Sequence, residues 1–314
     1  MKKPERRECY KEKNNWRKRQ QFLPEHNRIE DDLVPQEKVW DWNGNRIHLD
    51  FYPAPQSDYK VILLHGVGGN GRVLSFIGVP LYKKGIEIIA PDLPGYGCSE
   101  VRVEHNDYPH WVQLVQDLIE EEAKKDNKKI ILFGLSAGGM LAYHAGCNNR
   151  YVKGMIFTSL LDQRIRDVRD LSARNKFMSR VGIGLLSVLN GINGSIKLPM
   201  KMVANMNKIV NHKEILELLI NDPLSSGAKV PVRFIISMIN YNPAIEPEAF
   251  SGCPVSLLHP EDDRWTPTRL SELTFSKFQV KKEFKILENA GHFPVEQPGL
   301  KQLEEWSTRF ILER

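Results

Sequence analysis

The chain has 314 residues, of which 41% are hydrophobic and 26% are charged, enough to bury one large core with a subdomain beside it. The sequence contains no run of about 18 consecutive apolar residues, as a membrane-spanning helix requires, and the first 30 residues lack the apolar middle of a secretory signal. These features exclude a transmembrane protein and predict a soluble globular protein of the cytoplasm.

The four cysteines are scattered along the chain and form no CxxC pair or disulfide-rich spacing; they are Cys9, Cys98, Cys147 and Cys253. This spacing argues against a structural zinc site and against a disulfide scaffold, so reduced thiols are expected.

The net charge of +5 comes from the N-terminal arm, residues 1–37, because residues 1–30 hold ten Lys or Arg against five Glu and the rest of the chain is balanced. A basic arm can contact nucleic acid or an acidic membrane. Its apolar stripe is thin, however, so we predict a solvated helix or tail that touches the body through Trp16 and Phe22. We assign the arm no function and expect no nucleic-acid partner.

From Lys38 onward, short apolar strands alternate with helical patterns, which is typical of an α/β protein with a mostly parallel sheet and helices on both faces. The first two strands, Lys38–Trp42 and Arg46–Tyr52, should form an antiparallel hairpin through Asn43-Gly44. Six further strands are predicted at Val61–Leu64, Glu87–Ala90, Ile130–Phe133, Val152–Thr158, Val255–His259 and Phe284–Leu287, giving eight strands in all.

The clearest helix, Trp111–Lys125, carries apolar residues with a 3.6-residue period. The strand alternation stops after about Leu160 and resumes after Phe250. We therefore predict a helical cap over residues 161–250, inserted after the sixth strand, and an α/β core over residues 38–160 and 251–314. Helical runs at Pro267–Lys277 and Leu300–Leu312 complete this core.

A candidate nucleophile lies in the pentapeptide Gly134-Leu135-Ser136-Ala137-Gly138. The predicted strand before it and the helix-forming run Ala137–Ala145 after it place Ser136 on a sharp strand-to-helix turn. Side chains at positions 134 and 138 would collide with neighbouring backbone in so tight a turn. Ser136 is therefore predicted to be exposed at the carboxyl end of its strand, where the helix N-terminus favours an oxyanion.

A serine hydroxyl needs a base, normally a histidine that a carboxylate orients. His292 directly follows the last predicted strand and is the predicted base. The acid should come from the loop after the preceding strand, where we favour Asp263 over Asp262, because adjacent side chains point in different directions. Asp162, just past the Val152–Thr158 strand, stays an alternative.

The order Ser136, Asp263, His292 and its placement after these strands resemble the α/β-hydrolase superfamily over residues 38–314. Further motifs agree with this resemblance: His65-Gly66-Val67-Gly68-Gly69 resembles its HG oxyanion loop, the segment 92–99 resembles its DxPGxGxS turn, and the segment 263–267 resembles its DxxxP acid loop. Within that superfamily, the sequence resembles the monoacylglycerol lipases, lysophospholipases and serine aminopeptidase-like (S33-type) hydrolases. Pro260 departs from the family pattern, which usually has Gly before the acid loop.

The resemblance implies that the backbone N–H groups of Val67 and Ala137 form the oxyanion hole and that His65 and Asp92 shape loops. It implies hydrolysis of a small-molecule carboxylic ester through an acyl-enzyme and without a metal or organic cofactor. The apolar composition of the cap leads to the narrower hypothesis of a monoacylglycerol or lysolipid substrate. Thioester hydrolysis, peptide cleavage, acyl transfer and a non-catalytic ligand-binding role stay alternatives. A transient membrane contact is compatible with this reading, and the oligomeric state is left open.

Several apolar cap residues are expected either to line an acyl pocket or to form the core of the cap itself; they are Met178, Ile183, Leu185, Leu186, Val188 and Leu189.

Overall fold

The computed structural model describes residues 9–12, 15–173 and 178–314. Its centre is an eight-stranded sheet with the strand order β1-β2-β4-β3-β5-β6-β9-β10. The strands are β1 (Gln36–Trp42), β2 (Asn45–Tyr52), β3 (Tyr59–Leu64), β4 (Glu87–Pro91), β5 (Lys129–Gly134), β6 (Val152–Phe157), β9 (Val255–Pro260) and β10 (Lys282–Leu287). All neighbours from β4 to β10 pair in parallel, whereas β2 pairs antiparallel with both β1 and β4. The predicted mostly parallel eight-stranded sheet is confirmed.

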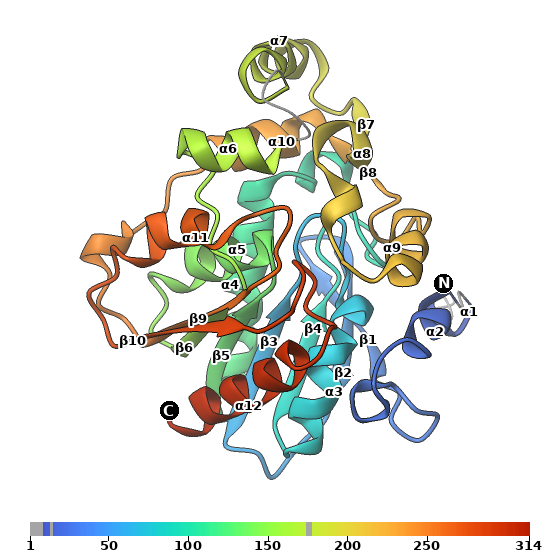
Figure 1. Cartoon of the computed structure of the whole chain (residues 1–314), viewed down its shortest axis with the longest axis vertical. Coiled ribbons are helices and arrows are strands. Elements are labelled where there is room, and N and C mark those ends of the chain that lie inside the picture. The colour runs from blue at the N-terminus through green and yellow to red at the C-terminus, as the bar shows by residue number, and fades with distance from the viewer. Residues whose placement is uncertain (1–8, 13–14, 174–177) are drawn as a thin grey trace.

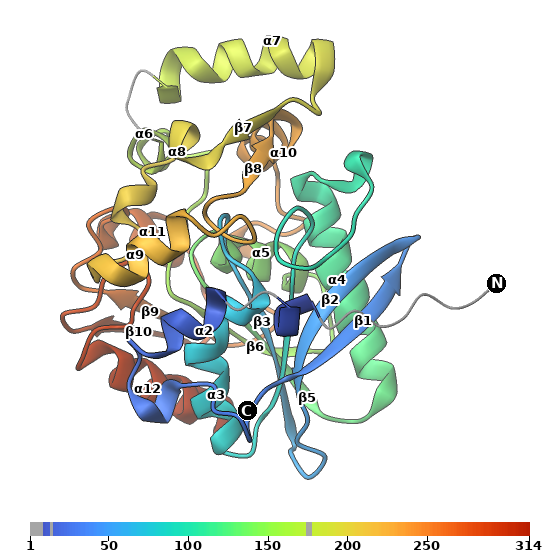
Figure 2. The ribbon, with the colours of Figure 1, turned by 90° about the vertical axis from the view of Figure 1, so that its right-hand side faces the viewer.

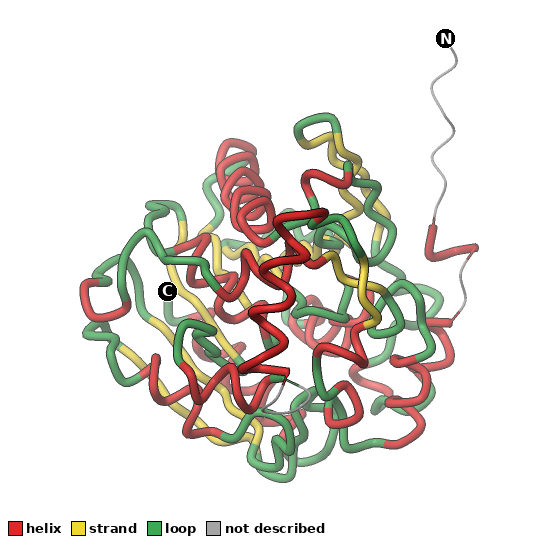
Figure 3. Tube along the Cα trace, turned by 90° about the horizontal axis from the view of Figure 1, so that it is seen from above, coloured by secondary structure: helices red, strands yellow, loops and turns green. Residues whose placement is uncertain are grey.

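Helices cover both faces of this sheet (Figure 1), and the same layering is visible from above in Figure 3. On one face α3 (Ser75–Lys83) packs against α12 (Gly299–Leu312), and on the other α4 (Tyr108–Lys125) packs against α5 (Ala137–Gly146). A shorter helix, α11 (Thr268–Phe275), contacts β9. The central strands are apolar along nearly their whole length because both of their faces are covered.

The predicted hairpin forms as expected. Asn43 and Gly44 have φ angles of +48° and +73°, the two positive values that a tight turn of this kind requires. The turn pairs Trp42 with Asn45 and sets the register of the first two strands.

The chain between β6 and β9 forms a separate group of short elements over the carboxyl ends of the parallel strands (Figures 1 and 2). Its helices are α6 (Arg166–Ser172), α7 (Ile183–Asn193), α8 (Met200–Val203), α9 (Lys213–Ile220) and α10 (Val232–Ile239). A mainly helical pattern was expected here, but the segment also contains an antiparallel pair, β7 (Lys197–Pro199) and β8 (Lys229–Pro231). Each of these strands has only three residues, too few to leave an alternating pattern in the sequence.

The arm is better anchored than the sequence predicts. It contains α1 (Cys9–Glu12) and α2 (Asn15–Gln20), and α2 packs beside α9 (Figure 2). Trp16 contacts the body as predicted and is only 3% exposed, and Phe22 packs on the core. The expectation of a solvated arm is nevertheless wrong for Tyr10 and Arg19, which are also buried.

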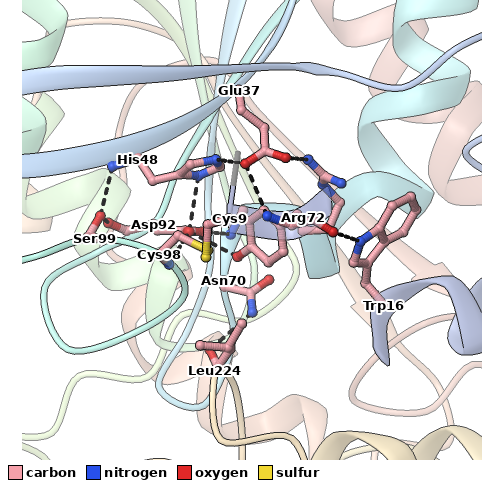
Figure 4. The surroundings of a disulfide bond; sticks show 12 residues. Cys9, Trp16, Glu37, His48, Asn70, Arg72, Asp92, Cys98, Ser99 and Leu224 are labelled. Carbon is pink, nitrogen blue, oxygen red and sulfur yellow. Dashed lines mark hydrogen bonds and ion pairs between the residues drawn. A yellow bond between two sulfur atoms is a disulfide. The ribbon is translucent and has the colours of Figure 1, made fainter. Parts of the chain in front are cut away.

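The expectation that all thiols are reduced is also wrong, because Cys9 and Cys98 form a disulfide across a separation of 89 residues (Figure 4). Cys147 and Cys253 are free and buried. Pairing over such a distance depends on how the arm folds back onto the core, which cysteine spacing does not reveal.

In the described part of the chain, no helix combines the length and the hydropathy that crossing a bilayer would need.

Candidate active site

Ser136 lies where β5 ends and α5 begins, in a backbone conformation with φ +58° and ψ −127°. A Cβ at Gly134 would lie 2.0 Å from the carbonyl oxygen of Gly138, and a Cβ at Gly138 would lie 2.1 Å from that of Leu64. Only glycine fits at these two positions, as the motif predicts. The turn presents the Ser136 side chain at the carboxyl edge of the sheet.

The structure brings the three predicted side chains into one hydrogen-bonded chain. His292 Nε2 lies 2.7 Å from Ser136 Oγ, and His292 Nδ1 lies 2.7 Å from Asp263 Oδ2. Because a carboxylate can only accept, Nδ1–H donates to Asp263 and leaves Nε2 free to accept the Ser136 proton. This is the tautomer that general-base catalysis requires.

Asp263 is held as a carboxylate by its surroundings. Burial raises the pKa of Asp263, but the neighbouring His292 and hydrogen bonds from His292 and Thr266 outweigh burial and lower the pKa to about 2. The backbone N–H groups of Trp265 and Thr266 both donate to Oδ1. The acid is therefore ionised at neutral pH and fixed in orientation.

The other candidate acids do not contact His292. Asp262 is exposed, and its backbone N–H donates to Ala290. Asp162 is buried but forms an ion pair with Arg164 at 2.7 Å. Pro260, despite departing from the family pattern, pairs in regular register with Leu287, so the loop that follows keeps Asp263 in place.

Two side chains that the sequence analysis did not assign support this chain of contacts. The Thr266 hydroxyl donates to Asp263 Oδ2 at 2.7 Å and lies 3.1 Å from His292 Nδ1. The Trp265 ring packs on the His292 ring at a centroid distance of 4.9 Å. The sequence offered one signal for Thr266, a threonine three residues after the predicted acid. Its hydroxyl could be assigned a role only after the structure had placed Asp263 and His292 beside it.

Val67 and Ala137, the predicted oxyanion donors, line the same cavity as Ser136. Ala137 is the first residue of α5, so its N–H has no acceptor within the helix. A Cβ at Gly66 would lie 2.9 Å from Ser136 Cβ, which shows how closely the loop that carries Val67 approaches Ser136.

His65 and Asp92 lie behind this loop and hold its shape. The Leu93 N–H donates to His65 Nε2, so Nδ1 carries the proton that is shared with the Gly66 carbonyl. Burial lowers the pKa of His65 to about 4, which keeps the ring neutral. Asp92 accepts from the backbone N–H groups of Gly71 and Cys98 and so ties two turns together.

A cavity of about 130 Å³ opens beside Ser136 and His292. One wall follows a single face of α5, where Ser136, Met140 and His144 are each four residues apart. The opposite wall comes from α10, including Phe234 and Met238. Most of the side chains that line the cavity are apolar, so its surface suits a hydrocarbon chain.

The predicted cap residues divide into distinct groups. Ile183 and Leu186 line the cavity, whereas Leu189 packs on the core. Leu185 and Val188 are 63% and 62% exposed, so for these two both expectations are wrong. The side chain of Met178 lies outside the described residues.

Within the described residues, no group of three or more His, Cys, Asp or Glu side chains is arranged to hold a metal ion.

The family model described as serine aminopeptidase, S33, matches residues 55–297, well over half of the sequence.

Solved structures with this fold include lipases and an esterase. A soluble variant of the Saccharomyces cerevisiae monoglyceride lipase is 18% identical with a TM-score of 0.73, and the match covers 89% of this chain and 96% of that one. The Paleococcus ferrophilus monoacylglycerol lipase is 19% identical with a TM-score of 0.67, covering 85% and 98% of the two chains. An esterase from Exiguobacterium antarcticum is 15% identical with a TM-score of 0.63, covering 89% and 98%. At such identities the likeness carries the fold alone.

Proposed function

This chain belongs to the serine aminopeptidase S33 family of α/β-hydrolases, and from that membership we propose that it is a serine esterase whose catalytic residues are Ser136, His292 and Asp263. The observation that carries the proposal is the hydrogen-bonded chain from Asp263 through His292 to Ser136, with both contacts at 2.7 Å, at the edge of an apolar cavity. A serine flanked in this way can act as a nucleophile at neutral pH.

The reaction proceeds in two acyl-transfer steps. Ser136 Oγ attacks the ester carbonyl while His292 Nε2 takes its proton, and the backbone N–H groups of Val67 and Ala137 stabilise the oxyanion. His292 returns the proton to the leaving alcohol, which leaves the acyl group on Ser136. Water then attacks this acyl-enzyme with His292 again as base, while Asp263 stabilises the imidazolium.

The proposed substrate is an ester with a hydrophobic acyl chain, such as a monoacylglycerol or a lysolipid. The cavity beside Ser136 supports this choice, because an acyl chain that lies along Met140 and faces Phe234 would bury apolar surface. Two of the similar structures are of monoglyceride lipases. Thioester hydrolysis, cleavage of an N-terminal peptide bond and transfer to an alcohol use the same residues and are distinguished by substrate.

The first experiment asks whether Ser136 is a reactive nucleophile. A fluorophosphonate probe should add covalent mass to the wild type and none to the Ser136→Ala variant, whereas Ser251→Ala, at an exposed serine, should label normally. Unlabelled wild type would favour a non-catalytic ligand-binding member of the family.

A panel of p-nitrophenyl esters of graded acyl length then tests the substrate class. We expect kcat/KM to rise with chain length, and Ser136→Ala to lower it by about four orders of magnitude. A labelled enzyme that hydrolyses only short esters would refute the lipid substrate but retain the serine esterase. Parallel assays with thioesters, N-terminal peptides and an added alcohol rank the competing activities.

The cellular compartment calls for a separate measurement. The sequence predicts the cytoplasm, but disulfides such as Cys9–Cys98 are typical of oxidising compartments. We keep the cytoplasm as the prediction, and subcellular fractionation followed by immunoblotting tests it; recovery of the protein outside the cytoplasmic fraction would overturn it.

A further inference from the structure

The arm is tied to the core next to the loop that holds Asp92. Cys9 is bonded to Cys98 (Figure 4). The hydroxyl of the next residue, Tyr10, donates a hydrogen bond to Asp92 Oδ2 at 2.9 Å. Both cysteines are partly exposed. The first anchor of the arm is thus a covalent bond that a dissolved reductant can reach.

The middle of the arm packs around one buried arginine. The guanidinium of Arg72 lies 4.5 Å from the Tyr10 ring centroid and 4.6 Å from that of Trp16. Trp16 Nε1 donates to the Tyr10 carbonyl at 2.8 Å. Arg72 is buried, and both of its ring contacts depend on the position of Tyr10, the residue next to Cys9.

The far part of the arm contacts the cap. Arg19 donates to Asp222 Oδ2 at 2.8 Å, and the two side chains are only 7% and 5% exposed. Removing either partner would leave the other charge buried and unpaired. Phe22 packs on His212 at a centroid distance of 5.3 Å.

Asp222 begins a tight cap loop, residues 222–228, that lies on the oxyanion loop. Asp222 itself accepts from the backbone N–H groups of Leu224 and Gly227, which fixes the shape of the cap loop. The Leu224 carbonyl accepts from Asn70 Nδ2, and Ser226 Oγ donates to the Gly68 carbonyl at 2.9 Å. Gly68 directly follows Val67, the proposed oxyanion donor.

From this series of contacts we infer that residues 9–12 and 15–28 form a strap, latched by the Cys9–Cys98 disulfide, which positions the oxyanion loop through Arg19, Asp222 and the cap loop. The inference rests on the proposed esterase function and adds redox control of the same site. Arg19 is a positioning residue in this scheme because it acts through Asp222.

The switching step needs a dithiol reductant. One thiolate of the dithiol attacks a sulfur of the Cys9–Cys98 bond and forms a mixed disulfide, and its second thiolate displaces the protein sulfur. The dithiol is oxidised to a disulfide, while Cys9 and Cys98 become thiols with the two protons that it releases. The strap is then held by non-covalent contacts alone, so its local opening becomes more frequent.

The test compares oxidised and dithiothreitol-reduced protein under native conditions, with the number of alkylated cysteines read by intact mass. Reduction should add two reactive thiols. It should also lower kcat for a p-nitrophenyl ester about tenfold and change KM little, because a displaced oxyanion donor weakens stabilisation of the transition state and not binding of the substrate. Affinity for a trifluoromethyl ketone, which forms a tetrahedral adduct with serine, should fall in parallel. Trypsin should cut the arm faster once the latch is open.

Matched variants isolate the latch. Cys9→Ser should behave like reduced wild type and not respond to dithiothreitol, whereas Cys253→Ser, at a free buried cysteine, should keep the full response. Arg19→Met should lower kcat with the disulfide intact, with lysine at the same position restoring part of it.

Full reduction with unchanged kcat, ketone affinity and arm cleavage would overturn the inference, as would protein prepared without reductant in which Cys9 and Cys98 are already alkylated. Failure of the esterase proposal is distinct, because it appears as absent fluorophosphonate labelling of oxidised wild type. In that case faster cleavage of the arm after reduction still tests the latch.

Discussion

At the scale of single residues, Thr266 shows how one hydroxyl can support the proposed catalytic arrangement. It donates to the Asp263 oxygen that also accepts from His292, and its backbone N–H donates to the other oxygen of the same carboxylate. Both Asp263 oxygens are therefore held before any substrate arrives. Such preorganisation lowers the cost of orienting the imidazole in the transition state.

We predict that Thr266→Val lowers kcat about tenfold and leaves KM nearly unchanged, because the variant keeps the volume and loses one hydrogen bond to a charged group. Thr266→Ser should restore most of the activity. Thr268→Val is the matched control, since the Thr268 hydroxyl lies near His259 instead. Equal losses in both valine variants would assign the effect to loop packing.

At the scale of elements, α7 exposes large apolar side chains to solvent. Leu185, Val188 and Ile192 of α7, together with Val181 just before this helix, recur at helical spacing and are between 56% and 77% exposed. The helix lies at the end of the molecule away from α12 (Figures 1 and 2), and exposed lysines on β7 and β8 follow it in the chain. An apolar stripe accompanied by positive charge suits an anionic lipid surface.

We therefore expect the double variant Leu185→Ser/Val188→Ser to bind vesicles of phosphatidylcholine and phosphatidylserine several-fold more weakly than wild type in co-sedimentation. Hydrolysis of a water-soluble ester should not change, because neither side chain lines the cavity. Leu273→Ser, an exposed leucine on α11, should bind vesicles like wild type. Undiminished binding by the double variant would rule out α7 as the contact.

At the scale of the whole molecule, a buried charged cluster joins the hairpin, the core and the arm. His48 Nε2 lies 3.1 Å from Glu37, and its Nδ1 lies 3.1 Å from Asp92. Burial lowers the pKa of His48, but the carboxylates of Asp92, Glu37 and Asp50 outweigh burial and raise the pKa to about 10. His48 is therefore charged at neutral pH, and the fold depends on that charge.

This cluster predicts an alkaline loss of stability. The folded-state pKa of His48 exceeds the ordinary value of 6.5, so its contribution is fully present below pH 6.5 and is lost as pH rises towards 10. The free energy of unfolding, measured in urea without reductant, should fall by about a few kcal/mol over this range. This decrease in the free energy of unfolding should be smaller in the His48→Gln variant than in wild type. It should equal the wild-type decrease in His26→Gln, which changes a partly exposed histidine. A parallel decline in all three proteins would remove His48 as the cause.

Much of the fold and the proposed site could be predicted because the signals are local. The asparagine-glycine turn, the branched strands and the glycines around Ser136 each report on a few consecutive residues. No role was predicted for Thr266, and the two roles expected for Leu185 were wrong, because the surroundings of both side chains depend on which distant elements approach them. The three-residue strands β7 and β8 were missed for lack of a long enough pattern.

The sequence by itself determined the α/β architecture, the position of the proposed nucleophile Ser136 and the turn that presents it, since backbone sterics and strand-to-helix periodicity act over short stretches. Only the tertiary structure decided that Asp263 and not Asp262 contacts His292, that Cys9 pairs with Cys98, and that the arm packs into the body. Each of these depends on the direction of a side chain or on an approach between segments far apart in the chain. Ser136 can therefore be identified as the proposed nucleophile from five consecutive residues. The strap that we infer to position the oxyanion loop is apparent only in the folded chain.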